Sequence, residues 1–264
     1  MNYAAAVEDW NGRYFDDAAD EGVVAPPMFA VAVTWPLVTG IQKLLGGVVP
    51  VETMGRLVHA AESLVFHHPI RPGVTLVLGG EVVALVPTRA GALMTLRFDA
   101  AEKDGTPIFT ERVGALFRGV SCDSVKLSAE KAEEAGLVDT DAPPAWTAEI
   151  PVSRCAAHVY DGCTDIVFPI HTSRTYALKV GLPDIILQGT ATLALAAREI
   201  VNRECNSNPA CLRELSGRFT GMVVPGQTIR VQCWRGGNGR VAFKVLNDRG
   251  EASIDGGAAL LVED

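Results

Sequence analysis

A β unit that occurs twice is the feature of this 264-residue sequence that most constrains its fold. In the first half, the segment 66–85 contains the turn Pro72-Gly73, and in the second half the segment 218–236 contains the turn Pro225-Gly226. After each turn, apolar residues recur at every second position, which is typical of a half-buried strand. Each segment leads into a hairpin, with turns at Asp104-Gly105 and at 248–250. The pattern predicts two copies of one antiparallel unit.

A helix of apolar and small residues is expected before each copy. In the second half it spans about 189–202 and has almost no polar face, so we expect it to be buried. In the first half it begins at about Phe29, and Pro36 is expected to interrupt or kink it. The sequence therefore predicts an α+β fold, with the two units paired edge to edge so that their outer strands are covered.

The strip 160–177 is the most informative segment for function, because it places His171 on a Pro-Ile-His turn in mostly apolar surroundings. Histidine can accept or return a proton near neutral pH. Further along the chain, Gly189, Thr190 and Ala191 begin the second predicted helix. Small residues at a helix start allow a ligand to approach the backbone N–H groups. These two segments predict one candidate site.

The octet 164–171, TDIVFPIH, and the later pair Gln188-Gly189 resemble the MaoC-like, or hydratase-2, family of hot-dog proteins. In that family the octet reads roughly S-G-D-x-N-P-L-H, and a His-Gly pair begins the long central helix. The resemblance implies a double hot-dog, with two antiparallel sheets each wrapped around a central helix. It also implies reversible addition of water to a 2-enoyl thioester, with a coenzyme A thioester as substrate and no cofactor. By this resemblance His171 moves the proton and the Gly189 N–H stabilises the thioester oxyanion.

Three positions depart from the family pattern: Ile166 stands at the aspartate, Phe168 at the asparagine and Gln188 at the histidine. Asp165 precedes the aspartate position by one residue, and in a bulge or loop its carboxylate could turn toward His171. In a regular strand it would point to the opposite face and remain a solvated carboxylate. We take Asp165 as a candidate acid or base under the first alternative.

Substrate-binding roles are predicted for Phe168, Gln188 and Tyr160. An aromatic ring at position 168 would make the pocket drier and could stack on an acyl group. Gln188 would keep some polarity at the entrance of the helix, because its amide can both donate and accept.

Three functions remain open at this point. A hydro-lyase of the enoyl-CoA hydratase kind is favoured by His171 and Gly189. A non-catalytic acyl-thioester-binding or assembly module is favoured by Ile166 and Phe168. A hot-dog thioesterase is the third, although no acid follows Gly189 in the segment 190–192.

The chain divides into an amino-terminal hot-dog (1–120), a connector (121–151) and a carboxy-terminal MaoC-like hot-dog (152–264). The connector is expected to hold a short solvated helix near 128–135. No Pro-x-His turn occurs in the first half, so we expect it to be non-catalytic and to form a wall of the substrate pocket. His59 and His158 are expected on strands or strand entries.

Charge and composition limit the partners. With 31 acidic against 23 basic side chains and a net charge of −8, the chain has no general attraction for nucleic acid or an anionic membrane. The phosphates of coenzyme A would need local basic groups, and Arg174, Lys179, Arg218 and Arg235 are available. The six cysteines show no metal-binding spacing and are expected to be reduced. No signal peptide or membrane span is recognised, so we expect a cytoplasmic protein that can form a homodimer.

Overall fold

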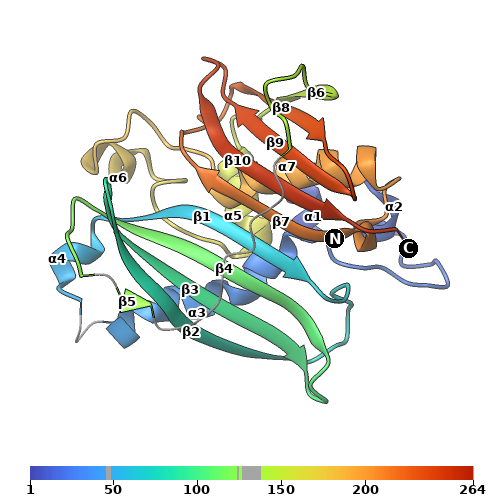
Figure 1. The fold of residues 1–264 in the computed structure, drawn as a ribbon, viewed down its shortest axis with the longest axis horizontal. Helices are drawn as coiled ribbons and strands as arrows, with labels where there is room; N and C mark the ends of the chain where they lie inside the picture. Colours follow the sequence, from blue (N-terminus) through green and yellow to red (C-terminus); the bar gives the residue numbers. More distant parts are fainter. Residues whose placement is uncertain (46–48, 124, 127–137, 264) are drawn as a thin grey trace.

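The computed structural model describes residues 1–45, 49–123, 125–126 and 138–263. Within these ranges the strands form one ten-stranded antiparallel sheet in the order β5-β2-β3-β4-β1-β7-β10-β9-β8-β6 (Figure 1). The strands are β1 (Leu57–Phe66), β2 (Leu76–Thr88), β3 (Gly91–Glu102), β4 (Pro107–Arg118), β5 (Val125–Lys126), β6 (Trp146–Pro151), β7 (Leu212–Phe219), β8 (Thr228–Arg235), β9 (Arg240–Leu246) and β10 (Ala252–Leu261).

The predicted repeat is confirmed by the order of the strands. In the first half β1 is followed across the sheet by β4, β3 and β2, and in the second half β7 is followed by β10, β9 and β8. The turn at Asp104-Gly105 joins β3 to β4, and the turn at 248–250 joins β9 to β10. Gly105 and Gly250 have φ values of 93° and 78°, a conformation that glycine adopts without strain. Each half is the same four-stranded unit with one additional edge strand.

The two halves join through β1 and β7, which pair antiparallel with Ala61 opposite Arg218 and Leu64 opposite Leu215. Edge-to-edge pairing was predicted, and the structure confirms it. Two antiparallel sheets were predicted, and in the structure the β1–β7 ladder joins their strands into one continuous sheet. The backbone N–H and C=O groups along this seam are therefore satisfied by the other half.

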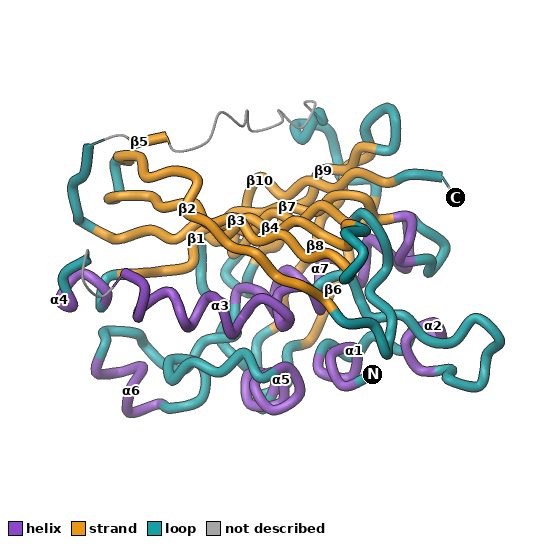
Figure 2. The backbone as a smooth tube through the Cα atoms, turned by 90° about the horizontal axis from the view of Figure 1, so that it is seen from below, coloured by secondary structure: helices purple, strands orange, loops and turns teal. Residues whose placement is uncertain are grey.

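The helices lie on one side of the sheet, as Figure 2 shows, with α3 and α7 against it and α1, α5 and α6 farther out. Their bounds are α1 (Asn2–Ala6), α2 (Gly12–Phe15), α3 (Phe29–Leu45), α4 (Val51–Met54), α5 (Ala156–Thr164), α6 (Arg174–Lys179) and α7 (Gly189–Glu204), with a 3₁₀ turn at Pro209–Cys211. The predicted starts of α3 and α7 are both confirmed. Pro36 lies inside α3 and does not interrupt it.

The main hydrophobic core runs through both halves rather than dividing at the predicted boundary. It includes Tyr3 and Leu64 from the first half together with Leu193, Leu215 and Phe243 from the second. The first residues of the chain also cross the boundary, because α1 packs against α5. The two halves therefore share the main core, while a second cluster of buried residues, among them Met94 and Phe98, lies in the first half alone.

The range assigned to the connector contains β6, which pairs with β8 and so belongs to the second half of the sheet. The short helix predicted near 128–135 lies outside the described residues. None of the helices in the described ranges is long and apolar enough to span a membrane. All six cysteines are free thiols.

Candidate functional site

His171 lies in the loop between α5 and α6, half-buried against the segment that leads into α7. Its Nδ1 is 2.8 Å from the carbonyl oxygen of Ile186. A carbonyl oxygen can only accept, so Nδ1 carries the proton and Nε2 of the neutral ring keeps its lone pair. Burial lowers the pKa of His171 to about 4, although the hydrogen bond to Ile186 acts in the opposite direction. The imidazole is therefore neutral at physiological pH, with Nε2 free to act as a base.

Gly189 is the first residue of α7, three positions beyond Ile186, as predicted from the sequence. Its α-carbon lies against the Phe219 ring, and a methyl group added there would be 3.0 Å from the nearest ring carbon. Within the described residues, no side chain accepts a hydrogen bond from the N–H groups of the first turn of α7. These N–H groups, at the positive end of the helix dipole, can stabilise a negatively charged oxygen.

Gln188 precedes α7 but does not cap it, because its amide points toward α5. The Gln188 Nε2 group donates to the Ala157 carbonyl oxygen at 3.1 Å and to Oδ1 of Asp161. Gln188 and Asp161 are both buried. Burial raises the pKa of Asp161 to about 6, and the hydrogen bond from Gln188 partly offsets that effect. The carboxyl group that the structure brings to the start of α7 is therefore that of Asp161.

Asp165 does not join His171 in this structure. It ends α5 in a left-handed conformation, with φ 58° and ψ 14°, and its side chain is exposed. In the described part of the chain, no hydrogen bond or ion pair links its carboxylate to His171. The next residue, Ile166, is buried in the main core. The loop geometry that could have turned Asp165 inward instead turns Ile166 inward.

The other two predicted pocket residues have different environments. Tyr160 is fully buried on α5, where its hydroxyl donates to Thr190 Oγ1 at 3.2 Å and lies 2.8 Å from the Tyr3 hydroxyl. Phe168 is 40% exposed, and its ring lies beside those of His171 and Tyr176, with centroids 6.5 and 6.4 Å away. Tyr160 therefore supports the start of α7 from inside, and Phe168 flanks His171 from outside.

Sequence reasoning missed Asp161 because it took this segment as a mostly apolar strip. The residues 156–164 form α5, and Ala157, Tyr160, Asp161 and Thr164 make its buried face at the spacing of a helix. That spacing was the signal that could have identified Asp161. His158, expected on a strand, also lies on α5, and its Nε2 donates to the Thr172 carbonyl oxygen at 3.2 Å.

Three of the four basic residues considered for phosphate binding are already paired with carboxylates. Arg174 lies 3.4 Å from Asp184, Arg218 lies 2.7 Å from Asp255, and Arg235 lies 2.8 Å from Glu204. For Lys179, at the end of α6, no ion pair is seen among the described residues. Lys179 is the basic group nearest in sequence to His171 that is open to a phosphate.

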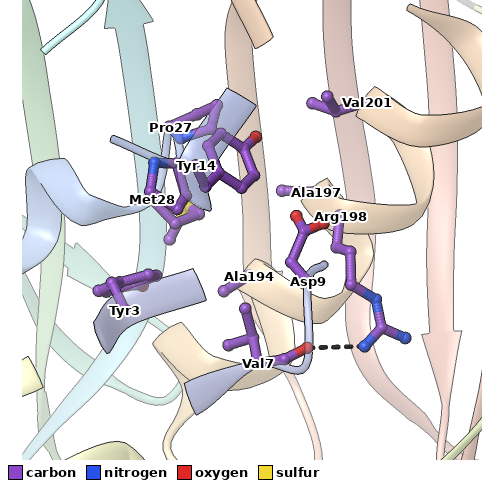
Figure 3. Close-up of a pocket in the computed structure, with 11 residues that line it drawn as sticks. Tyr3, Val7, Asp9, Tyr14, Pro27, Met28, Ala194, Ala197, Arg198 and Val201 are labelled. Carbon is purple, nitrogen blue, oxygen red and sulfur yellow. Dashed lines mark hydrogen bonds between the residues drawn. The ribbon is translucent and has the colours of Figure 1, made fainter. Parts of the chain in front are cut away.

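A small cavity lies farther along α7, where the amino-terminal segment covers the helix (Figure 3). Tyr3, Tyr14 and Met28 meet Ala194 and Ala197 around it. Arg198 holds this segment in place by donating to the Val7 carbonyl oxygen at 2.6 Å. The cavity is separate from His171 and marks the packing of the amino terminus on the second half.

The fold and the site together define a protein with a repeated antiparallel unit. One copy of the unit carries a histidine and an uncapped helix start. Comparison with known families matches residues 138–255 to the "MaoC like domain" and residues 1–111 to the "FAS1-like, dehydratase domain region". The match over residues 138–255 confirms the resemblance of the carboxy-terminal half to the MaoC-like family that was seen in the sequence.

The chain is also similar over nearly its whole length to known proteins, although it spans less than half of the first of them. The chain is 26% identical over 263 residues to peroxisomal multifunctional enzyme type 2 of Drosophila melanogaster, covering 97% of this chain and 43% of that protein. It is 23% identical over 262 residues to enoyl-CoA hydratase ChsH3 of Mycobacterium tuberculosis, and the match covers 99% of this chain and 89% of that protein. The crystal structure of a MaoC-like dehydratase from Phytophthora capsici has the same fold, with a TM-score of 0.87, 21% identity, and coverage of 100% and 90%.

Proposed function

We propose that this protein is an acyl-thioester hydratase, which adds water reversibly to a 2-enoyl-CoA. The observation that carries the proposal is the free Nε2 of His171. The Ile186 carbonyl fixes the other ring nitrogen, and Ile186 lies three residues before the uncapped start of α7. The name of the mycobacterial relative, enoyl-CoA hydratase, supports the same reaction. We also infer that each half wraps its strands around its helix as a hot-dog unit, α3 in the first and α7 in the second.

In the proposed reaction, His171 Nε2 takes a proton from water and the oxygen of that water bonds to C3 of the substrate. The electron pair of the C2–C3 double bond moves onto the thioester oxygen, where the Gly189 N–H stabilises the negative charge. Protonation at C2 then gives the 3-hydroxyacyl thioester. Asp161 acts indirectly, because it holds Gln188 and so fixes the residue from which α7 starts.

The test is to incubate the purified protein with a panel of 2-enoyl-CoA thioesters that differ in chain length. We expect loss of the enoyl absorbance without release of free thiol. His171→Ala should lower kcat by about 10² or more, because a general acid or base is lost. His68→Ala is the matched control, since His68 is exposed beyond the far end of β1.

Other outcomes would reject the proposal. Release of thiol would identify a thioesterase. Tight binding of acyl-CoA with every enoyl thioester unchanged would identify a non-catalytic binding module. Full activity of His171→Ala would remove His171 from the mechanism.

A further inference from the structure

The first half contains two buried glutamates that the proposed reaction does not yet use. Glu62 on β1 and Glu111 on β4 are 1% and 0% exposed. Glu111 lies opposite Leu64 and Glu62 lies opposite Val113, so the two side chains are diagonal neighbours on the same face of the sheet. Burial raises the pKa of both carboxyl groups well above the usual range, and repulsion from Glu62 adds to this for Glu111. Because burial and mutual repulsion both oppose ionisation, we expect the pair to keep one shared proton at neutral pH.

His59 connects this pair with the protein surface. Its Nε2 lies 3.0 Å from Glu62 Oε2 and 3.0 Å from the Ala61 carbonyl oxygen. Residues three apart on a regular strand point to opposite faces, but the β1–β4 register shifts between His59 and Ala61. That bulge turns His59 toward Glu62. Because the carbonyl oxygen can only accept, Nε2 carries the proton and Nδ1 keeps a lone pair.

The same histidine faces the start of α7 across one aromatic ring. The His59 and Phe219 ring centroids are 4.8 Å apart, and the Phe219 ring lies directly against the α-carbon of Gly189. The His59 side chain is 31% exposed, so it can exchange protons with solvent. His59 from the first half therefore reaches the start of α7 through the Phe219 ring, and His171 from the second half reaches it through Ile186.

Among the residues that the structure describes, the glutamate pair also acts on two tyrosines, Tyr3 and Tyr160. Burial raises the pKa of each, so both hydroxyls stay protonated and neutral at physiological pH. Tyr160 donates to Thr190 in the first turn of α7. Neither tyrosine therefore adds a charge between the glutamate pair and the helix start.

We propose that His59, oriented by Glu62 and Glu111, is the second acid/base group of the site and moves the proton at C2 of the substrate. This inference rests on the proposed hydratase function and assigns a catalytic residue to the half that the sequence suggested was non-catalytic. The Ala61 carbonyl fixes Nε2 of His59, and the Glu62 carboxyl group 3.0 Å away can balance a positive charge on the ring, which is how a carboxylate supports a histidine base.

In the dehydration direction, two protons move: one leaves C2 of the substrate and one joins the departing oxygen. His59 Nδ1 takes the proton from C2, and the electron pair of that C–H bond forms the C2–C3 double bond by way of the thioester enolate. The C3–O bond breaks as the departing oxygen takes a proton that is relayed from solvent through Nε2 of His171, so His171 is neutral before and after the step. The Glu62 carboxylate balances the charge of the His59 imidazolium while the shared proton rests on Glu111. His59 then releases its proton to solvent.

The experiment measures dehydration of a 3-hydroxyacyl-CoA by His59→Gln, with His68→Gln as the matched control. We expect kcat to fall by about 10² in His59→Gln while KM changes less than about threefold. Deuterium at C2 should give a larger kinetic isotope effect in His59→Gln than in the native protein, because removal of that proton becomes slower. A purely structural role for His59 would not change the isotope effect.

Glu62→Gln tests the positioning role of the pair, with the exposed Glu81→Gln on β2 as its control. We expect a fall in kcat of about tenfold and a displaced pH profile in Glu62→Gln only. If the native protein dehydrates the substrate and His59→Gln keeps its kcat and isotope effect, this inference is wrong and the hydratase function stands. If the native protein is inactive, the function itself fails.

A measurement on the native protein covers the case in which the His59 variant does not fold. Histidine labelled with ¹⁵N reports by NMR which ring nitrogen carries the proton. We expect the proton of His59 on Nε2 across the neutral range. A proton on Nδ1 would leave no lone pair directed away from Glu62 and would overturn the proposal.

Discussion

The strands β1 and β7 hold equivalent positions in the two halves, yet they differ at their buried centre. Glu62 lies ten residues before Pro72, and Leu215 lies ten residues before Pro225, so each has the same place relative to its Pro-Gly turn. Glu62 is 1% exposed, and Leu215 is 0% exposed. The repeated unit thus folds around leucine at this position. The carboxyl group of Glu62 is an addition that packing does not require.

The starts of the two central helices differ in a complementary way. The first three N–H groups of α3, from Phe29 to Val31, donate to the carbonyl oxygens of Pro26, Pro27 and Met28 at 2.9 to 3.2 Å. The corresponding N–H groups of α7 have no such backbone partners within the described ranges. The first half therefore has a closed helix start and a buried acid pair, whereas the second has an open helix start and His171. The acid pair therefore occurs only in the first of these two units, and the open helix start with His171 occurs only in the second.

Leu215→Glu should have the largest effect, because it places the carboxyl of the first half in the second half without its partners. Glu62 has Glu111 and His59 beside it, whereas the core around Leu215 is apolar. An uncompensated buried charge costs about 3–5 kcal/mol. Urea unfolding should show this loss, and Ser216→Glu, on the other face of β7, should cost less than about 1 kcal/mol. Equal losses in both variants would contradict the comparison.

Glu62→Leu is the reverse exchange and should stabilise the protein by about 1–3 kcal/mol, since replacing buried ionisable groups with apolar ones often does so. The gain should grow as the pH rises. The native fold keeps protons on the pair at pH values where the unfolded glutamates, with pKa near 4.3, have lost them, so native stability falls with rising pH. Thermal unfolding between pH 5 and pH 8 measures the difference. A gain independent of pH would argue against the shared proton.

Gly189→Ala should have the smallest effect of the three and should act on turnover. The added methyl group would lie 3.0 Å from the Phe219 ring, so this ring must move by a few tenths of an ångström. We expect a fall in kcat of about tenfold, equivalent to about 1.4 kcal/mol, from a displaced helix start. Gly12→Ala, where the added methyl group meets no neighbouring atom, is the control. Unchanged turnover in Gly189→Ala would mean that the open helix start is not used.

The fold was predictable because it rests on local patterns. The Pro-Gly turns, the alternation after them and the apolar helices at 29 and 189 each act over a few residues, and the structure reproduces them. The continuity of the sheet was harder to predict, because pairing of β1 with β7 joins residues about 150 positions apart. Nothing in either strand alone distinguishes one sheet from two touching sheets.

The site was predictable only in part, for a related reason. His171 and Gly189 belong to short motifs, whereas the Asp161–Gln188 contact and the His59–Phe219 contact depend on how distant elements pack. Asp165 was chosen by its place in the octet. The left-handed end of α5 then exposes it and buries Ile166 instead. A shift of one residue at a helix end decides which side chain enters the protein, and spacing alone does not specify that shift.

The β1–β7 seam has a genetic consequence. If the two halves were separate copies of one gene product, every substitution would appear on both sides of the seam, and a glutamate at position 62 would force a glutamate at its counterpart. Because one reading frame encodes both halves in tandem, each can mutate alone. Two covalently joined halves can thus have a glutamate on one side of the seam and a leucine on the other. Two identical subunits of a symmetric dimer must carry the same residue at both positions.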